Sequence, residues 1–368
     1  MESKNIINVV HMGCPYLPYQ GGSTKRLMNI AKFISHKGDV RQFIVTPTPG
    51  KKDEAKYFND VLRDESINKI NFNKNLWSFL FQKKVDVVVL HNSRVLLKWM
   101  FFYKIFFRKV KVIVEIHSFR KESFFTKLLN KITYKMSDRI VHLSRSSVTY
   151  MDECYGVMPF NVVYNGIDAK KIRKNDRCYN RTNTTYAYIG SFHDWQGVNF
   201  IAQSAKNIGI EYWKVNNLVL IGDGPELDNV KNILSDMIKE GANIFIYGWK
   251  DDDFIKNKID SVDFLLAVRP SCIATETVFP LKIVDSIKFG VPLICTNVGG
   301  LVEVVYDQGA AFYIDKNNQH ALVDFWNNKP CYHDYYSVVK ALEKTSEEFD
   351  SWEVAADSYH EIYRSLVE

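Results

Sequence analysis

Short apolar runs alternate with amphipathic segments along most of this chain of 368 residues. A run of about four to eight aliphatic residues between turn residues is typical of a buried strand, whereas apolar residues at i, i+3 and i+4 indicate a helix. Strands are predicted at residues 6–10, 42–45, 86–90, 111–116, 139–143, 186–190, 217–221, 243–247, 262–268 and 291–295. Strands that alternate with helices predict mostly parallel, doubly wound sheets, whose ligands bind beyond the carboxyl ends of the strands.

One stretch, residues 276–303, contains the elements of half a nucleotide-binding α/β unit. A turn leads into a predicted helix with Lys282 near its start, and Gly290 stands where a helix is expected to end. A buried strand should follow, then a loop at 297–300, and Glu303 is expected in the first turn of the next helix. A lysine beside a helix N-terminus favours an anion site.

This stretch resembles the donor-binding segment of the retaining, GT-B-fold glycosyltransferases of the family 4 type. That family carries two glutamates eight positions apart, then a helix ending in Gly-x-Pro-x-Ile and a Gly-Gly-x-x-Glu loop. The second acidic position falls on Asp285, and the first falls on Thr277, a departure with Glu276 beside it. Lys282 matches a branch with a Pro-x-Lys-x-x-Glu pattern. The alternative is a plain αβα unit of any Rossmann-like protein.

Two features of the first half also match the family. Gly21 and Gly22 precede a predicted helix that Ser23 is expected to cap. They resemble the Gly-Gly loop that faces the donor phosphates and the acceptor, although a simple tight turn would have the same glycines. His117 follows the strand at 111–116 and resembles the family histidine near the reacting sugar. An ordinary loop histidine is the alternative.

One motif near the expected domain boundary matches the family, and two positions after it depart from the family. Residues 165–168, Asn-Gly-Ile-Asp, resemble its interdomain motif, and a polar linker follows. After Gly190 the family has an arginine and then a lysine, but this chain has Ser191 and Gln196. Arg269 is a candidate for the missing donor-clamp cation, with an ordinary surface ion pair as the alternative. Because a Ser-Phe-x-x-Trp-x-Gly variant exists within the family, the departure indicates a branch.

The acidic run at residues 251–253 suggests another class of enzyme. Glycosyltransferases of the GT-A fold hold manganese with an Asp-x-Asp motif. Aspartate is also favoured as a helix cap and in the first helical turn, and we prefer this interpretation. No metal is therefore expected in the site.

Composition excludes several other classes. The six cysteines form no CxxC pair, which argues against a zinc site or a disulfide framework and fits reduced, cytosolic thiols. A net charge of +6 favours anionic ligands or an anionic membrane surface over nucleic acid. The N-terminus lacks a long apolar region, so we expect no signal peptide and a cytoplasmic location.

Two basic, aromatic segments, residues 95–108 and 120–135, lie in the first half of the chain. The first is too short and too charged to span a bilayer. Helices of this composition can lie in a membrane interface, so peripheral contact with the inner face of a membrane is one expectation. The alternative for each is a helix packed on the sheet with its lysines in solvent.

The resemblance covers nearly the whole chain and implies an α/β protein of GT-B architecture, with two Rossmann-like domains facing across a cleft. We expect an acceptor-binding domain at 1–168, a nucleotide-sugar-binding domain at 169–345, and a C-terminal helix at 346–368 that packs back on the first domain. The apolar face of that helix should contain Trp352, Ala355, Tyr359, Ile362 and Leu366.

The implied function is metal-independent transfer of a sugar, with retention of configuration, from a UDP- or GDP-linked donor to a glycan or lipid-linked acceptor in cell-surface polysaccharide or glycoconjugate synthesis. The resemblance implies no cofactor. It makes His117 and Asp285 catalytic. The donor-binding residues are expected to be Gly21, Gly22, Gly190, Ser191, Gln196, Arg269, Glu276, Thr277, Lys282, Gly299 and Gly300. Two alternatives remain: a non-catalytic GT-B subunit that stabilises an active partner, and a GT-B epimerase or phosphorylase.

Overall fold

The computed structural model describes residues 6–17, 21–49, 57–64, 74–91, 109–167, 179–305 and 309–368. It divides the chain into two compact units. Unit 1 comprises Met1–Ala169 and Asp350–Glu368, and unit 2 comprises Lys170–Phe349. The sequence placed these divisions after residues 168 and 345.

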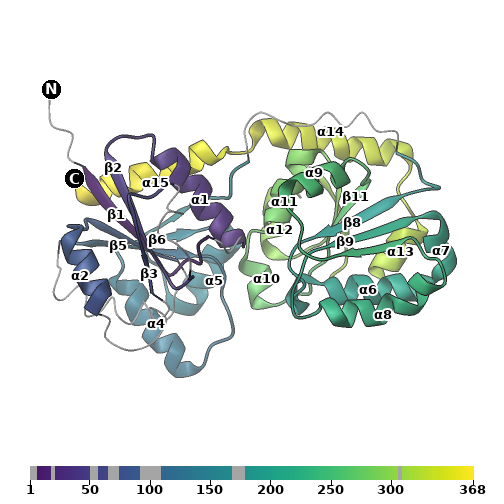
Figure 1. The fold of residues 1–368 in the computed structure, drawn as a ribbon, viewed down its shortest axis with the longest axis horizontal. Coiled ribbons are helices and arrows are strands. Elements are labelled where there is room, and N and C mark those ends of the chain that lie inside the picture. Colours follow the sequence, from purple (N-terminus) through teal and green to yellow (C-terminus); the bar gives the residue numbers. More distant parts are fainter. Residues whose placement is uncertain are drawn as a thin grey trace. The chain divides into compact units, whose positions relative to one another are not determined.

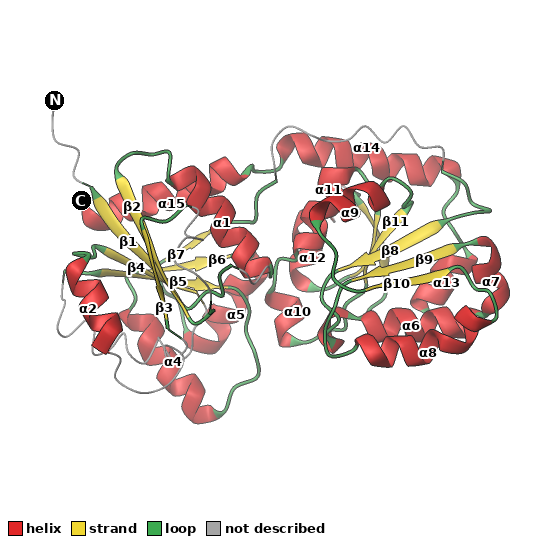
Figure 2. Ribbon diagram, viewed as in Figure 1, coloured by secondary structure: helices red, strands yellow, loops and turns green. Residues whose placement is uncertain are grey.

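The described residues of unit 1 form a seven-stranded parallel sheet with the order β3-β2-β1-β4-β5-β6-β7 (Figure 1). The strands are β1 (Ile7–Met12), β2 (Val40–Thr46), β3 (Asp60–Arg63), β4 (Val87–His91), β5 (Lys111–Ile116), β6 (Arg139–His142) and β7 (Phe160–Val162). The helices are α1 (Gly22–Ile34), α2 (Lys74–Gln82), α4 (Phe124–Met136), α5 (Arg145–Tyr155) and α15 (Trp352–Val367). They lie on both sides of the sheet (Figure 2).

Unit 2 has the same plan, with a six-stranded parallel sheet in the order β10-β9-β8-β11-β12-β13 within its described residues. The strands are β8 (Thr185–Ile189), β9 (Asn217–Ile221), β10 (Ile244–Tyr247), β11 (Phe264–Ala267), β12 (Leu293–Thr296) and β13 (Ala311–Ile314). The helices are η3 (Asp194–Gln196), α6 (Val198–Ile208), α7 (Ile210–Val215), α8 (Leu227–Lys239), α9 (Asp252–Ile259), α10 (Ile273–Thr277), α11 (Leu281–Phe289), α12 (Gly299–Val305), α13 (Ala321–Asn327) and α14 (Tyr332–Glu348).

The predicted doubly wound α/β architecture is confirmed in both units, but the sequence analysis missed β3, β7 and β13. Two of these strands, β3 and β7, form the edges of the first sheet, and β13 is an edge of the second. An edge strand is covered on fewer sides, so it needs no continuous apolar run. The segment FNV in β7 shows the result, since none of its residues is fully buried.

Three helix starts test the local predictions. The cap of α1 is Gly21, not Ser23, which lies inside the helix. In α9, Asp251 is the N-cap and its side chain accepts a hydrogen bond from the backbone N–H of Phe254, as the helix-start interpretation predicted. Residues 299 and 300 belong to α12 and not to a loop, so the first turn of that helix contains no acidic residue and the placement of Glu303 there was wrong.

The C-terminal helix α15 packs on α1 within unit 1, as expected. Its start lies beside the segment that follows β7. The N–H of Ile167 donates to the carbonyl of Asp350, and the N–H of Trp352 donates to the carbonyl of Ile167. A Cβ at Gly166 would overlap the backbone at Trp352, so this close approach requires glycine. The Asn-Gly-Ile-Asp motif therefore marks the place where two distant segments of unit 1 pair.

Within the described residues no helix has the length and apolar character that crossing a bilayer requires. The predicted interfacial segment 95–108 lies outside the described residues. The second segment, 120–135, contains α4.

Candidate functional site

The candidate site of unit 2 lies where its strand order reverses, between β8 and β11. Ligands of open parallel sheets bind beyond the carboxyl ends of the strands at such a switch point. Gly190 directly follows β8, and Arg269 comes two residues after β11. Helix α11 begins after its N-cap, Pro280, and its second residue is Lys282. Three residues that the sequence analysis selected from separate stretches therefore come together.

Lys282 is a buried lysine whose amine has no hydrogen-bond partner among the described residues. Its side chain is only 9% exposed, and Nζ lies 3.5 Å from the centre of the Tyr188 ring. The ring face offers a cation some compensation, but less than water does. Burial lowers the pKa of Lys282 well below its usual value, the charge of Arg269 lowers it further, and Asp285 opposes the shift.

Arg269 is a second buried cation with unused donors. One guanidinium nitrogen, Nη2, donates to Oε1 of Gln196 over 2.9 Å, whereas Nε and Nη1 have no partner among the described residues. The guanidinium also lies over the Trp195 ring, 5.4 Å from its centre. Burial lowers the pKa of Arg269 to about 10. The alternative interpretation, an ordinary surface ion pair, does not describe this residue.

The two basic side chains can together present an excess of positive charge to a ligand. In the described part of the chain, neither Lys282 nor Arg269 forms an ion pair with a carboxylate. Buried charge without a partner costs several kcal/mol, so natural proteins rarely keep it without a reason. The nearby start of α11 adds N–H groups that also favour an anion. The arrangement is suited to an anionic ligand such as a diphosphate.

Gly190 lets the lysine approach the backbone. Its φ of +153° is a conformation that residues with a side chain rarely adopt, and a Cβ there would lie 3.0 Å from Cε of Lys282. The hydroxyl of Tyr188 donates to the carbonyl of Ser191 over 2.6 Å, which holds the ring that faces the amine. The Ser191 side chain is exposed. Gly190 thus leaves room for Lys282, and the Ser191 carbonyl fixes the Tyr188 ring beside it.

Glu276 holds the start of α12. Its carboxylate accepts hydrogen bonds from Ser271 Oγ at 2.6 Å, Lys316 Nζ at 2.6 Å and the backbone N–H of Gly299 at 2.8 Å. Burial alone would raise the pKa of Glu276, but these donors lower it below its usual value. A Cβ at Gly299 or at Gly300 would overlap the backbone of residues 276–279, so both glycines permit close packing.

The two acidic positions of the family motif differ in what they can contact. Thr277 is 3% exposed, and its hydroxyl donates to the carbonyl of Ile273 over 2.7 Å. Asp285 is partly exposed on α11, three residues after Lys282 and therefore on the same helical face. Of the two, Asp285 is the better placed to reach a ligand.

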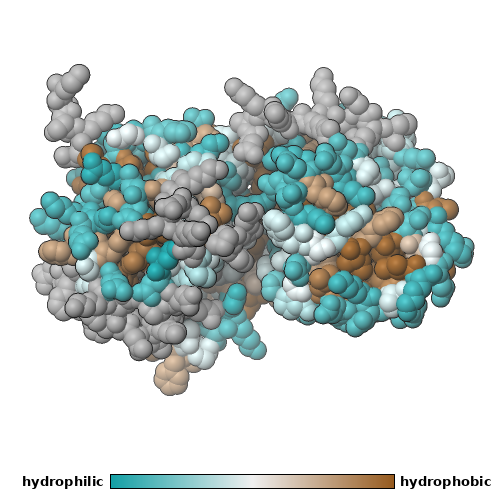
Figure 3. Space-filling model, viewed as in Figure 1, coloured by the Kyte–Doolittle hydropathy of each residue, from teal (hydrophilic) through white to brown (hydrophobic). Residues whose placement is uncertain are grey.

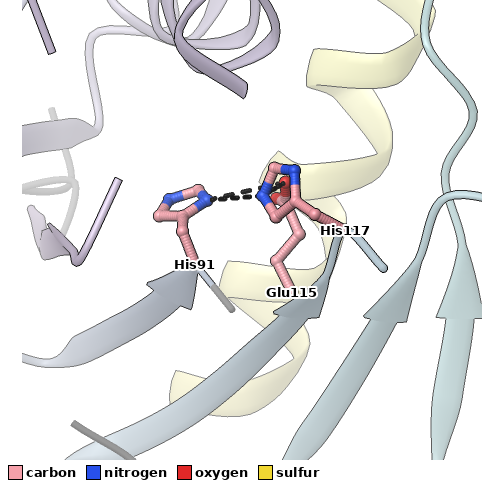
Figure 4. A group of neighbouring side chains, drawn as sticks. All are labelled: His91, Glu115 and His117. Atoms are coloured by element: carbon pink, nitrogen blue, oxygen red, sulfur yellow. Dashed lines mark hydrogen bonds and ion pairs between the residues drawn. The ribbon is translucent and has the colours of Figure 1, made fainter. Parts of the chain in front are cut away.

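The candidate site of unit 1 also lies at a switch point, between β1 and β4. His91 ends β4, Glu115 lies in β5 and His117 directly follows β5 (Figure 4). Residues two apart on a strand share a face, so Glu115 and His117 point the same way. Nε2 of His117 lies 2.8 Å from Oε1 of Glu115, and Nδ1 of His91 lies 3.5 Å from that oxygen. Behind them, His11 Nδ1 lies 3.0 Å from His91 Nε2.

Glu115 is the charge centre of this cluster. It is 1% exposed, and Arg26 Nε donates to Oε1 over 3.1 Å, while the Tyr359 hydroxyl donates to Oε2. Burial would raise the pKa of Glu115, but Arg26 and the histidines hold it well below its usual value. Burial lowers the pKa of His117 below 6.5, although the carboxylate opposes this. Near neutral pH the cluster therefore contains a carboxylate and a neutral His117.

His91, Glu115 and His117 each offer an atom within 4.8 Å of the others, close enough to ligate one ion. However, Arg26 and Tyr359 already occupy both oxygens of the carboxylate. A divalent cation would also stand beside a buried guanidinium, and like charges repel strongly at low dielectric. A hydrogen-bonded cluster fits these contacts better than a metal site does.

The predicted residues divide between the two units. Unit 1 holds Gly21 and Gly22 at the start of α1, and His117 after β5. Unit 2 holds the other ten predicted site residues. The sequence analysis missed Glu115, Arg26 and His91. A carboxylate in the apolar run Lys-Val-Ile-Val-Glu-Ile, two residues before a histidine, was the available signal.

Both halves of the chain match known glycosyltransferase families. Residues 20–171 match the family described as "Glycosyltransferase Family 4", and residues 183–326 match "Glycosyl transferases group 1". An uncharacterized glycosyltransferase of Methanocaldococcus jannaschii is 25% identical over 392 residues, which cover 98% of this chain and 99% of that protein. An uncharacterized protein of the cps region of Klebsiella pneumoniae is 26% identical over 67% of this chain and 72% of its own length.

Solved structures of similar fold span the whole chain. HepE of Anabaena, solved in complex with UDP-glucose, superposes with a TM-score of 0.75 at 14% identity, over 98% of this chain and 100% of that one. Sucrose-phosphate synthase of Thermosynechococcus elongatus gives 0.76 at 12% identity, over 98% and 99%. A glycosyltransferase of Rickettsia africae gives 0.73 at 15% identity, over 99% of each chain. Together with the two sheets and the family matches, this shows that the chain belongs to the GT-B-fold glycosyltransferases of the group 1, family 4 type.

Proposed function

We propose that this glycosyltransferase uses a UDP- or GDP-linked sugar and transfers it, with retention of configuration and without a metal ion, to a glycan or lipid-linked acceptor of a cell-surface polysaccharide or glycoconjugate. The observation that carries the proposal is the pair of buried basic residues, Lys282 and Arg269. Nζ of the lysine and two guanidinium nitrogens of the arginine, Nε and Nη1, have no hydrogen-bond partner among the described residues. A nucleoside diphosphate brings the negative charge that such a pair requires. The complexes of HepE with UDP and with UDP-glucose support this choice of donor.

Each residue of the site then has a role in the transfer. The two cations and the N-terminus of α11 stabilise the diphosphate as charge develops on the leaving group. Asp285 accepts a hydrogen bond from a hydroxyl of the donor ribose or sugar. Glu276 positions the start of α12 through Gly299. His117, in unit 1, is proposed as a catalytic residue on the family resemblance.

A panel of nucleotide sugars, assayed by release of nucleoside diphosphate from the purified chain, tests the proposal. We expect turnover with a UDP- or GDP-sugar once an acceptor glycan or glycolipid is present, and NMR of the product should show the donor's anomeric configuration. An inverted product would overturn retention. Turnover only after a second glycosyltransferase is added would favour the non-catalytic subunit.

Turnover should survive chelation. We expect this because protein cations take the place of a metal ion at the diphosphate, so that no metal ion is needed to stabilise the leaving group. The donor assay is repeated after dialysis against EDTA, with a manganese-dependent glycosyltransferase as the control. Loss of activity that manganese restores would show that the ion belongs to this reaction.

Asp285→Asn should lower kcat/KM by roughly ten- to a hundredfold while leaving the fold intact. A hydrogen bond to a charged acceptor is worth about 1.5–3 kcal/mol, and the amide keeps the shape of the side chain without its charge. Asp228→Asn is the matched control, because that side chain on α8 is 93% exposed. Equal kcat/KM for the two variants would place the hydroxyl contact elsewhere.

Helix α4 presents its apolar side chains to solvent. Its exposed residues are Phe124, Phe125, Leu128, Leu129 and Ile132, while Asn130, Thr133 and Tyr134 face inward. Hydrophobic atoms project from the part of unit 1 where Figure 1 places α4 (Figure 3). Four lysines flank this face: Lys121, Lys127, Lys131 and Lys135. An exposed apolar face with a basic rim matches an anionic membrane surface, which would present lipid-linked acceptors.

The protein should bind vesicles of phosphatidylcholine mixed with phosphatidylglycerol more tightly than vesicles of phosphatidylcholine alone, and added salt should weaken the binding by screening. Replacing both Phe124 and Phe125 by serine should remove most of it, because each buried aromatic side chain contributes about 1.5–3 kcal/mol. Trp249→Ser, which changes an exposed aromatic residue of unit 2, is the control. Cosedimentation that the double replacement leaves unchanged would exclude α4 as the contact.

A further inference from the structure

Glu115 receives hydrogen bonds or close polar contacts from four elements of unit 1. Arg26 comes from α1, His91 from the end of β4, His117 from the end of β5, and Tyr359 from α15. Yet a carboxylate that is 1% exposed cannot reach a ligand itself. Of its four partners, His117 keeps 16% of its side chain exposed and is the one that can.

The contacts determine which nitrogen of His117 carries the proton. The pKa of Glu115 lies well below its usual value, so the group is a carboxylate and can only accept hydrogen bonds. Nε2 of His117, 2.8 Å from that carboxylate, must therefore be the protonated nitrogen, since two lone pairs at this distance would repel. His117 is neutral near neutral pH, which leaves a lone pair on Nδ1. No hydrogen bond within the described residues occupies Nδ1.

We propose that Glu115 is a positioning residue for the transfer reaction: it holds His117 as the Nε2–H tautomer, so that Nδ1 is offered to substrate as an acceptor of a hydroxyl proton or hydrogen bond. The role of His117 in transfer rests on the proposed function, whereas the tautomer does not. Removing the carboxylate frees the ring to adopt the other tautomer, in which Nδ1 can only donate.

The partners of Glu115 explain how the carboxylate itself stays in place. Arg26 donates to Glu115 and also to the carbonyls of Val163 and Tyr164 and to Oδ1 of Asn165. This ties the carboxylate to the segment that pairs with the start of α15. The hydroxyl of Tyr359, on α15, holds its second oxygen. The C-terminal helix is thereby part of the support of His117.

The tautomer is measured directly on the unaltered protein. In long-range proton–nitrogen NMR spectra of chain labelled with 15N-histidine, the nine histidines give separate ring patterns, and His117→Gln identifies the pattern of His117. We expect the Nε2–H pattern for His117. A Nδ1–H pattern would overturn the proposal. Because this measurement needs no turnover, it remains decisive if no donor is found to react.

Kinetics test whether Glu115 acts through His117. Glu115→Gln should lower kcat by at least about tenfold, within the range that a positioned acid–base side chain supplies, and should leave the KM for the donor nearly unchanged. In the His117→Gln background the same change should have no further effect, because residues that act as one unit are not additive. If the effects of Glu115→Gln and His117→Gln on kcat multiply in the double variant, the proposal is contradicted.

Two further measurements guard against misfolding and against a metal. If Glu115→Gln does not fold, Tyr359→Phe takes its place as the test. This change removes one hydroxyl and keeps the ring, and it should also lower kcat. Elemental analysis of the purified protein, with spectra before and after EDTA, tests the metal alternative. Stoichiometric metal whose removal shifts the His117 pattern would replace the hydrogen-bonded cluster by a metal site and overturn the proposal.

Discussion

Replacing Lys282 by methionine should weaken the binding of a nucleoside diphosphate by roughly ten- to a hundredfold and leave binding of the free nucleoside almost unchanged. A charged hydrogen bond to phosphate contributes about 1.5–3 kcal/mol, and methionine fills the space over Tyr188 without carrying charge. Arg269 would still face the ligand, so some binding should remain. Calorimetry with the nucleoside diphosphate and with the nucleoside, side by side, measures both binding affinities.

The same titrations should show proton uptake. The pKa of Lys282 in the free protein is lowered by burial and by Arg269, and a bound diphosphate would raise it again. The heat of binding should therefore depend on the ionisation enthalpy of the buffer, and Lys282→Met should remove most of this dependence. Lys288→Met, on the same helix, is the matched control. If Lys282→Met weakens the binding of the nucleoside diphosphate and of the nucleoside equally, or weakens neither, Lys282 does not belong to the diphosphate site.

Arg26→Met should lower the free energy of unfolding of unit 1 by about 3–5 kcal/mol, the usual cost of removing one partner from a buried ion pair. The change leaves Glu115 charged and 1% exposed, and it also removes the donor to the carbonyls of Val163 and Tyr164. Urea unfolding, followed by circular dichroism and by tryptophan fluorescence, provides the measurement.

A second replacement identifies the cause of this loss. Arg26→Met combined with Glu115→Gln removes both charges, so part of the lost stability should return. Arg364→Met, at a surface pair with Glu368, should leave the urea midpoint unchanged. If the double variant is no more stable than Arg26→Met alone, the loss comes from packing or from the carbonyl contacts and not from the unpaired carboxylate.

Much of the fold could be predicted because its rules are local. Buried parallel strands need continuous aliphatic runs, and these were visible for the inner strands of both sheets, such as Val-Val-Val-Leu in β4. Edge strands lack that requirement, which is why β3 and β7 were missed. The edge strand β13, Ala-Phe-Tyr-Ile, is apolar and was missed all the same. Helix ends followed local chemistry at Gly290 and Asp251, whereas the start of α1 did not, because Gly21 takes the cap position before Ser23.

The composition of the site could be predicted only in part. Lys282, Asp285 and Gly190 stand in recognisable motifs, but Thr277 and Glu276 did not reveal what they contact. The structure turns the hydroxyl of Thr277 toward its own helix and gives the carboxylate of Glu276 three donors. Helix α4 posed a similar problem, since a periodic pattern shows that a helix has two faces but not which face meets the sheet.

The sequence by itself determined two parallel α/β units, the helix that starts beside Lys282, and the likeness of both halves to one family, because each depends on residues close together in the chain. Only the tertiary structure decided that Lys282 and Arg269 are buried together and that neither forms an ion pair with a carboxylate among the described residues. It alone also joined Glu115 to Arg26 and to Tyr359, which lie 89 and 244 positions away in the sequence. Charge balance in a protein interior depends on which side chains meet across such separations, and the order of residues along a chain does not specify those meetings one by one.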